Sequence, residues 1–155
     1  MPRNLYMGII ITVFTAVIAL DQITKHVVMT QMVEGQSIDI IGEFLRLVYV
    51  ENPGAAFSSF SGQRLILIGF PIMVILAGGL YLLKHRSESI FLNVTLSMIL
   101  AGGVGNLIDR IAKGSVTDMI SFSIFPPVFN VADIAVTVGC VMLLVYILIM
   151  GSGEE

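Results

Sequence analysis

The sequence predicts an all-α membrane protein with four transmembrane helices and a small β-structure that lies on the membrane surface. Hydrophobic residues make up 56% of the 155 residues and charged residues only 12%, whereas a soluble domain usually carries about a quarter of charged residues. Four apolar segments meet or approach the length of roughly 18 residues that crosses about 30 Å of hydrocarbon. We therefore expect a single integral membrane domain, residues 1–155.

The predicted spans cover residues 5–29, 65–83, 90–111 and 128–150. The first span is apolar from Leu5 to Leu20 and becomes more polar toward Met29. A cleaved signal peptide is the alternative, but the segment has no basic start beyond Arg3 and no small-residue cleavage site before Asp21. We interpret this segment as a retained helix.

Residues 30–64 form the long segment between the first two spans, and their composition is that of folded structure. SIDII at 37–41 and LRLVYVE at 45–51 are rich in β-branched, leucine and aromatic residues, which predicts strands. The sequence Asn52-Pro53-Gly54 predicts a turn, because proline presets its own φ and glycine accepts a positive φ.

The two remaining connections differ in length. Residues 84–89 are so few that the second and third spans should form an antiparallel hairpin. Residues 113–127 are expected to form a loop that ends in Pro126 and Pro127, which commonly precede the start of a helix.

Orientation is the property on which the charges give conflicting information. With four spans, both termini lie on the same side as residues 84–89, and the other side collects more Lys and Arg. The positive-inside rule would place that richer side in the cytoplasm. We discount this count because Lys25 and Arg110 each lie close to an acid and are candidate site residues.

Polar and charged residues gather at the ends of the predicted spans, where each charge near a helix centre would cost about 2.5–3.5 kcal/mol. Asp21 and Lys25 are spaced i and i+4, the favourable order for an ion pair on one helix face. Asn106 and Asp109 share the i, i+3 spacing at the end of the third span. The remaining members are Arg110, the loop residue Asp118, and Asn130 and Asp133 at the start of the fourth span.

Alternation of the spans would bring all of these groups to the same side of the membrane. Four acids then face two cations, so pairing each cation with one acid leaves two carboxylates without a cation. Like charges at a low-dielectric boundary share a proton, as in the carboxylate pair of an aspartic protease. These residues alone do not say which two acids form the pair, and structural ion pairs are the alternative.

Two other functions fit acids inside a membrane. A proton- or ion-coupled transporter uses such residues as relays, but here they cluster at one face and no inverted repeat is visible. A structural assembly subunit is the second alternative. We expect neither a metal nor another cofactor, because His26 and His85 are isolated in the sequence. Cys140 is the single cysteine and cannot form an internal disulfide.

Five segments, LDQITK, NPGAAF, GNLIDR, SVTD and FNVAD, occur in the order and with about the spacing of those in lipoprotein signal peptidases (signal peptidase II), which the chain resembles over nearly its whole length. The resemblance implies a bacterial inner-membrane aspartic endopeptidase that cleaves prolipoproteins just before a diacylglyceryl-modified cysteine. It also implies cytoplasmic termini, an extracytoplasmic β-cradle formed by about residues 30–64, and an active site at that face. Expected partners are the prolipoprotein substrate, membrane lipid and globomycin-type inhibitors; we expect a monomer and no nucleic acid.

Residue by residue, the resemblance implies that Asp118 and Asp133 are catalytic. It implies supporting or substrate-binding roles for Asn52, Gly54, Asn106, Asp109, Arg110 and Asn130, and structural roles for Asp21 and Lys25. The chain departs from the family pattern at Thr117 and Met119, where a valine and an aromatic residue are more common.

Overall fold

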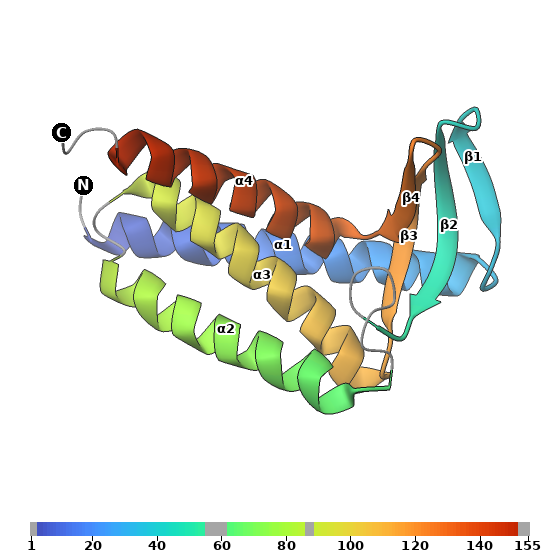
Figure 1. Ribbon diagram of the computed structural model, residues 1–155, viewed down its shortest axis with the longest axis horizontal. Coiled ribbons are helices and arrows are strands. Elements are labelled where there is room, and N and C mark those ends of the chain that lie inside the picture. Colours follow the sequence, from blue (N-terminus) through green and yellow to red (C-terminus); the bar gives the residue numbers. More distant parts are fainter. Residues whose placement is uncertain (1–2, 55–61, 86–88, 152–155) are drawn as a thin grey trace.

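The computed structural model describes residues 3–54, 62–85 and 89–151. It contains four long helices: α1 (Arg3–Gln31), α2 (Arg64–His85), α3 (Ile90–Ala112) and α4 (Val131–Gly151). Each is long and apolar enough to cross a membrane, which confirms the predicted number of spans. The start of α1 and the end of α4 lie at one end of the bundle, and a small sheet lies at the other end (Figure 1).

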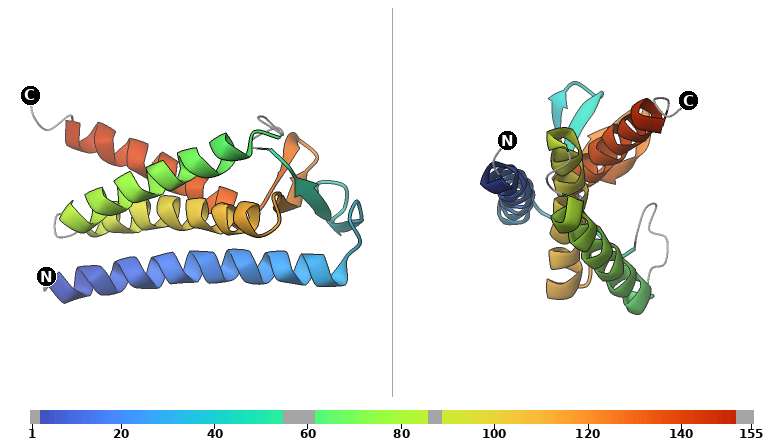
Figure 2. Two further views of the ribbon diagram at one scale, coloured as in Figure 1. Left: turned by 90° about the horizontal axis from the view of Figure 1, so that it is seen from below. Right: turned by 90° about the vertical axis from the view of Figure 1, so that its left-hand side faces the viewer.

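Helix α3 is the central element of the bundle, with α1, α2 and α4 packed around it (Figure 2). Glycines allow two of these contacts to be close. A Cβ atom on Gly102 would lie 2.4 Å from the carbonyl oxygen of Ala132, and one on Gly105 would lie 2.6 Å from Oδ2 of Asp21. Small residues are what membrane helices use to bring their backbones together, and here they bring polar groups of α1 and α4 next to α3.

The sheet has four antiparallel strands in the order β1 (Ser37–Ile41), β2 (Leu45–Asn52), β3 (Val116–Phe122) and β4 (Phe125–Phe129). The first two strands confirm the prediction made from SIDII and LRLVYVE. The second pair comes from the segment between α3 and α4, so residues far apart in the sequence pair in one sheet (Figure 1).

The prediction of a loop over residues 113–127 was wrong, because most of this segment forms the β3–β4 hairpin. Pro126 and Pro127 lie within β4 rather than before a helix. Strand β4 is at the edge of the sheet. Proline lacks a backbone N–H, and an edge strand tolerates it because one side of the strand has no neighbouring strand to pair with. Helix α4 begins at Val131, three residues after the predicted start at residue 128, because Val128 and Phe129 pair with β3.

The pairing of β2 with β3 contains an irregularity beside Asp118. Leu47 pairs with Ile120 and Val50 pairs with Asp118, so β2 has one more residue than β3 between these two pairs. Bulges of this kind bend a strand and re-aim its side chains, and they are common next to active sites. On one side of the sheet, Val28 and Met32 of α1 pack with Met119 of β3.

Candidate active site

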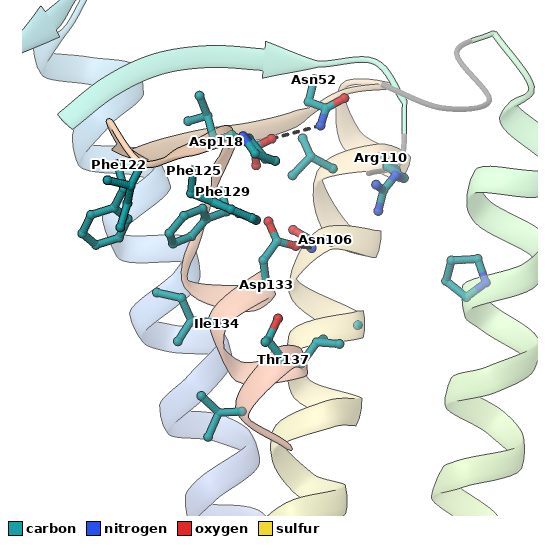
Figure 3. A pocket seen from close by; sticks show the side chains of 18 of the residues that line it. Asn52, Asn106, Arg110, Asp118, Phe122, Phe125, Phe129, Asp133, Ile134 and Thr137 are labelled. Carbon is teal, nitrogen blue, oxygen red and sulfur yellow. Dashed lines mark hydrogen bonds between the residues drawn. The ribbon is translucent and has the colours of Figure 1, made fainter. Parts of the chain in front are cut away.

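The polar residues singled out in the sequence converge where the helix bundle meets the sheet (Figure 3). Asp118 comes from the first half of β3 and Asp133 from the first turn of α4. Both side chains line a cavity of about 730 Å³, together with Asn52, Asn106 and Arg110. One carboxylate therefore approaches this space from the sheet and the other from the bundle.

Asp118 is buried, and two amides contact its carboxylate. Asn52 donates from Nδ2 to one carboxylate oxygen at 3.0 Å, and Asn130 donates from Nδ2 to the other at 2.7 Å. Asn52 is held in turn by an Asx turn, in which its Oδ1 accepts the N–H of Gly54 at 3.0 Å. The NPG sequence predicted as a turn thus fixes the side chain that contacts Asp118.

Asp133 and Asn130 form a reciprocal cap at the start of α4. The N–H of Asp133 donates to Oδ1 of Asn130 at 2.9 Å, and the N–H of Asn130 donates to Oδ2 of Asp133 at 3.2 Å. This is the capping-box arrangement, which satisfies two N–H groups at a helix start and fixes both side chains. The i, i+3 spacing seen in the sequence therefore orients Asp133 toward the cavity (Figure 3).

Asn106 on α3 connects the two carboxylates. Its Nδ2 donates to Oδ1 of Asp133 at 2.7 Å, and its Oδ1 accepts from Nδ2 of Asn130 at 3.0 Å. The same Oδ1 accepts from Nζ of Lys25 at 3.0 Å. Because a side-chain amide both donates and accepts, Asn106 passes hydrogen bonds from a buried cation to the acids without placing the cation beside them.

Lys25 is shared by two other acids. Its Nζ lies 2.9 Å from Oδ2 of Asp21 and 3.2 Å from Oδ2 of Asp109, and all three side chains are at most 5% exposed. The predicted i, i+4 pair of Asp21 with Lys25 is present, and Asp21 also accepts the N–H of Ala132 at 3.0 Å. These contacts tie α1 to α3 and to the start of α4.

The expectation that Arg110 would pair with one of the acids was wrong. Its Nη2 donates to the carbonyl oxygen of Gly54 at 3.0 Å, and its guanidinium lies at the side of the cavity (Figure 3). Asp109, the neighbour of Arg110 in the sequence, points to Lys25 instead. Consecutive residues of a helix point in different directions, so adjacency in the sequence did not indicate the partner.

Asp118 and Asp133 thus differ from the other two acids in what surrounds them. Within residues 3–54, 62–85 and 89–151, neither carboxylate has a salt bridge, and both are held by amide donors. Burial raises the pKa of Asp118 from 3.8 to about 6; the hydrogen bond from Asn52 opposes this rise, and the charge of Asp133 adds to it. Two acids of this kind at one cavity favour a shared proton.

The rest of the cavity is apolar and continues along α4. Three aromatic rings from the β3–β4 hairpin, Phe122, Phe125 and Phe129, form one side of it (Figure 3). Ile134 and Val138 extend the lining along the helix. These residues were not predicted from the sequence, because nothing local shows that an aromatic residue in an apolar chain faces a cavity.

Gln22 is a further site residue that was missed. Its Nε2 contacts Oδ1 of Asp109 at 3.2 Å, Oδ2 of Asp21 at 3.1 Å and the carbonyl oxygen of Gly105 at 3.2 Å. Its place inside the LDQITK segment was the available signal. In the part of the chain that the structure describes, no three His, Cys, Asp or Glu side chains form a group that could hold a metal ion.

Comparisons with known proteins agree on one family. The family model described as signal peptidase (SPase) II matches residues 13–149. The lipoprotein signal peptidases of Staphylococcus aureus strains JH9 and Newman are each 32% identical over 151 residues, which cover 96% of this chain and 93% of theirs.

Two solved structures described as bacterial membrane enzymes determined by the in meso method are also similar to the chain. The one at 2.3 Å resolution superposes with a TM-score of 0.90, with 32% identity and coverage of 96% of this chain and 92% of that chain. The one at 1.9 Å resolution has a TM-score of 0.81, with 32% identity and coverage of 91% and 93%.

Proposed function

The chain belongs to the signal peptidase II family, and we propose that it cuts the signal peptides of prolipoproteins with Asp118 and Asp133 as an aspartic catalytic pair. The observation that supports this pair is the contrast among the four acids. Asp21 and Asp109 share the cation of Lys25, whereas Asp118 and Asp133 face one cavity and are held by amides. Paired carboxylates that share a proton are the apparatus of aspartic proteases.

The reaction is peptide-bond hydrolysis without a covalent intermediate. A water molecule between the two carboxyl groups attacks the scissile carbonyl carbon while the ionised carboxylate accepts its proton. The protonated partner donates to the carbonyl oxygen. The first carboxyl group then gives the proton taken from water to the leaving amine as the carbon–nitrogen bond breaks, and the partner recovers a proton from the hydroxyl of the intermediate. Asn130 contacts both carboxylates, and Asn106 contacts Asp133 and Asn130. Together they keep the two carboxyl groups in place.

The substrate is a prolipoprotein whose cysteine carries a diacylglyceryl group, and the bond cut is the one before that cysteine. The apolar part of the cavity, lined by Phe122, Phe125, Phe129 and residues of α4, suits lipid chains that enter from the bilayer. Each buried methylene contributes about 0.8 kcal/mol. Binding energy gained away from the reacting bond can hold the scissile carbonyl against the pair.

In this proposal Asn106 and Arg110 contact the substrate backbone. Arg110 holds the carbonyl of Gly54, which leaves its other guanidinium nitrogens at the cavity side. The protein acts as a monomer and is a target of globomycin-type inhibitors that occupy the same cavity.

The orientation that goes with this function places both termini and the α2–α3 connection in the cytoplasm, and the sheet and active site at the outer face of the inner membrane. Single cysteines at position 43 on the sheet side and at position 84 at the end of α2, each in a Cys140→Ala background, test it. An impermeant thiol reagent applied to intact cells should label position 43 and spare position 84. The reverse pattern would show that the orientation is wrong.

The decisive experiment is cleavage by the purified protein in detergent. A precursor peptide with a diacylglyceryl cysteine should be cut just before that residue, and the same peptide without lipid should be cut far more slowly. Asp39→Asn, which removes an exposed acid of the same sheet, should leave the rate unchanged. A protein that fails to cut the lipidated peptide, but carries protons or ions across vesicles, would instead be a transporter.

A further inference from the structure

A second cluster of polar side chains lies on the side of the sheet that faces away from the catalytic pair. The carboxylate of Glu51, which is 19% exposed, accepts from Nζ of Lys113 at 2.7 Å and from Oγ1 of Thr117 at 2.9 Å. Tyr49 donates to it at 3.2 Å, and the hydroxyl of Ser115 donates to its second oxygen. One carboxylate therefore accepts from four donors, which come from β2, from β3 and from the short connection between α3 and β3.

The cluster is aligned with the catalytic acid through the strand register. Glu51 and Thr117 are register partners of β2 and β3. The next residues along the two strands are Asn52 and Asp118, which form their own hydrogen bond at 3.0 Å. Since successive side chains of a strand point to opposite faces, the same pair of strands carries Glu51–Thr117 on one face and Asn52–Asp118 on the other.

The backbone ladder is irregular at this point. The extra residue of β2 falls between the pairs Leu47–Ile120 and Val50–Asp118. A bulge disrupts the ladder locally and leaves the strand free to bend. The hydrogen bond from Thr117 to Glu51 joins the two strands immediately beyond the bulge, one residue from Asp118, and so adds a side-chain constraint to the ladder that resumes there.

The cluster is also tied to α3. The N–H of Thr117 donates to Oδ2 of Asp109 at 3.1 Å, and Nζ of Lys113 lies 3.9 Å from the same oxygen. Burial raises the pKa of Glu51, but hydrogen bonds from Lys113, Ser115 and Thr117 outweigh it, so the pKa of Glu51 lies below its ordinary value. The carboxylate therefore stays ionised while the enzyme works, and it holds its donors.

We propose that Glu51 is a positioning residue for the peptidase reaction: through Thr117 it fixes the part of β3 that aims Asp118 at Asn52 and at the cavity. This inference rests on the proposed role of Asp118 as a catalytic residue. It also assigns a purpose to the hydroxyl of Thr117, which stands where the family more often has a valine. Glu51 is not one of the residues found to line the cavity, so its effect on catalysis passes through the strand.

Glu51→Gln is the test, because glutamine keeps the size but carries no charge and cannot accept from all four donors. Cleavage of the lipidated peptide should show a kcat about fivefold lower with an unchanged KM, since the lipid cavity lies on the opposite face. The pKa of Asp118 is raised to about 6, and the ionisation of this group in the pH dependence of kcat/KM, which reports the free enzyme, should move to higher pH. The substitution should weaken the hydrogen bond from Asn52, which then stabilises the charged form of Asp118 less. The other groups around Asp118, namely Asp133, Asn130 and Lys25, are unaltered.

Companion variants make the result specific. Glu51→Asp should recover part of the rate, and Thr117→Val should lower kcat less than Glu51→Gln. The effects of Glu51→Gln and Thr117→Val should not add, because the two residues belong to one network. Asp39→Asn is the matched control, because it replaces an exposed acid on β1. It should change neither kcat nor the pH profile.

Three outcomes would overturn the inference. A wild-type kcat in Glu51→Gln is the first. The second is a lower thermal midpoint with an unmoved pH profile, which would make Glu51 a purely structural residue. Normal cleavage by Asp118→Asn is the third, and it alone would remove the proposed catalytic pair as well. An inactive Asp118→Asn together with a normal Glu51→Gln would leave the proposed function intact and reject only the role of Glu51.

Discussion

The four acids of the polar cluster divide into two pairs that are held by different kinds of partner. Asp21 and Asp109 lie on either side of the ammonium group of Lys25. Asp118 and Asp133 receive amide hydrogen bonds from Asn52, Asn106 and Asn130. A cation fixes an acid as a charged structural element, whereas amides leave it able to gain or lose a proton. In the proposed mechanism, the first pair holds the helices together and the second pair carries out the reaction.

The largest effect should separate the two pairs by activity. Asp118→Asn and Asp133→Asn should each lower the rate of cleavage by about a thousandfold or more, because general acid–base catalysis is lost. Asp21→Asn should retain a measurable part of the rate per folded molecule. Single-turnover cleavage of a lipidated peptide, normalised to monodisperse protein, is the measurement. Comparable losses of cleavage rate in Asp21→Asn and Asp118→Asn would contradict the proposed distinction between the two pairs of acids.

Removal of the shared cation should have the largest effect on stability. Lys25→Met leaves Asp21 and Asp109 buried without a counter-charge, and breaking a buried pair in this way costs about 3–5 kcal/mol. Thermal or denaturant unfolding in detergent would measure the loss. Adding Asp109→Asn to Lys25→Met should restore part of the stability, because one uncompensated charge is then removed. A double variant less stable than Lys25→Met would contradict this account.

The two pairs should also respond differently to loss of one acid. Asp109→Asn removes the charge that faces Lys25 and one of the two oxygens that accept from Gln22 and Thr117, so it should destabilise the protein by about 1–3 kcal/mol. Asp133→Asn relieves repulsion near Asp118 but loses one of two accepted hydrogen bonds. These effects oppose each other, so its stability should stay close to wild type. If Asp133→Asn proved the more destabilising variant in thermal unfolding at neutral pH, Asp133 would be a structural residue.

The smallest effect is a pH dependence of stability. The pKa of Asp118 is raised from 3.8 to about 6 in the folded protein, so the folded state binds this proton more tightly than the unfolded chain does. Its stabilising contribution is complete below pH 3.8 and is lost as pH rises through about 6. The thermal midpoint of Asp118→Asn minus that of wild type should therefore increase between pH 4 and pH 7, roughly the window between the two pKa values. A constant difference would mean that the pKa of Asp118 is unshifted by folding.

Much of the fold followed from local sequence features. The apolar segments gave the number of helices, and the SIDII and LRLVYVE stretches gave two of the four strands. Strands β3 and β4 were missed because Pro126 and Pro127 suggested a helix start, and only an edge position in a sheet accommodates them. The i, i+4 pair of Asp21 and Lys25 was predictable, since both partners lie on one helix. The link from Lys25 to Asp109 joins two helices and has no local signature.

The sequence by itself determined that four helices cross the membrane and that the acids meet at one end of them, because the cost of placing charge in hydrocarbon acts on each segment separately. The motifs also determined the family. Only the tertiary structure decided which acids share Lys25 and which face the cavity. That choice depends on the close approach that Gly102 and Gly105 allow between helices and on the bulge that directs Asp118. The helix contacts and the strand pairing both involve segments that are distant in the sequence. The environment of each acid is therefore set only when these segments have packed together.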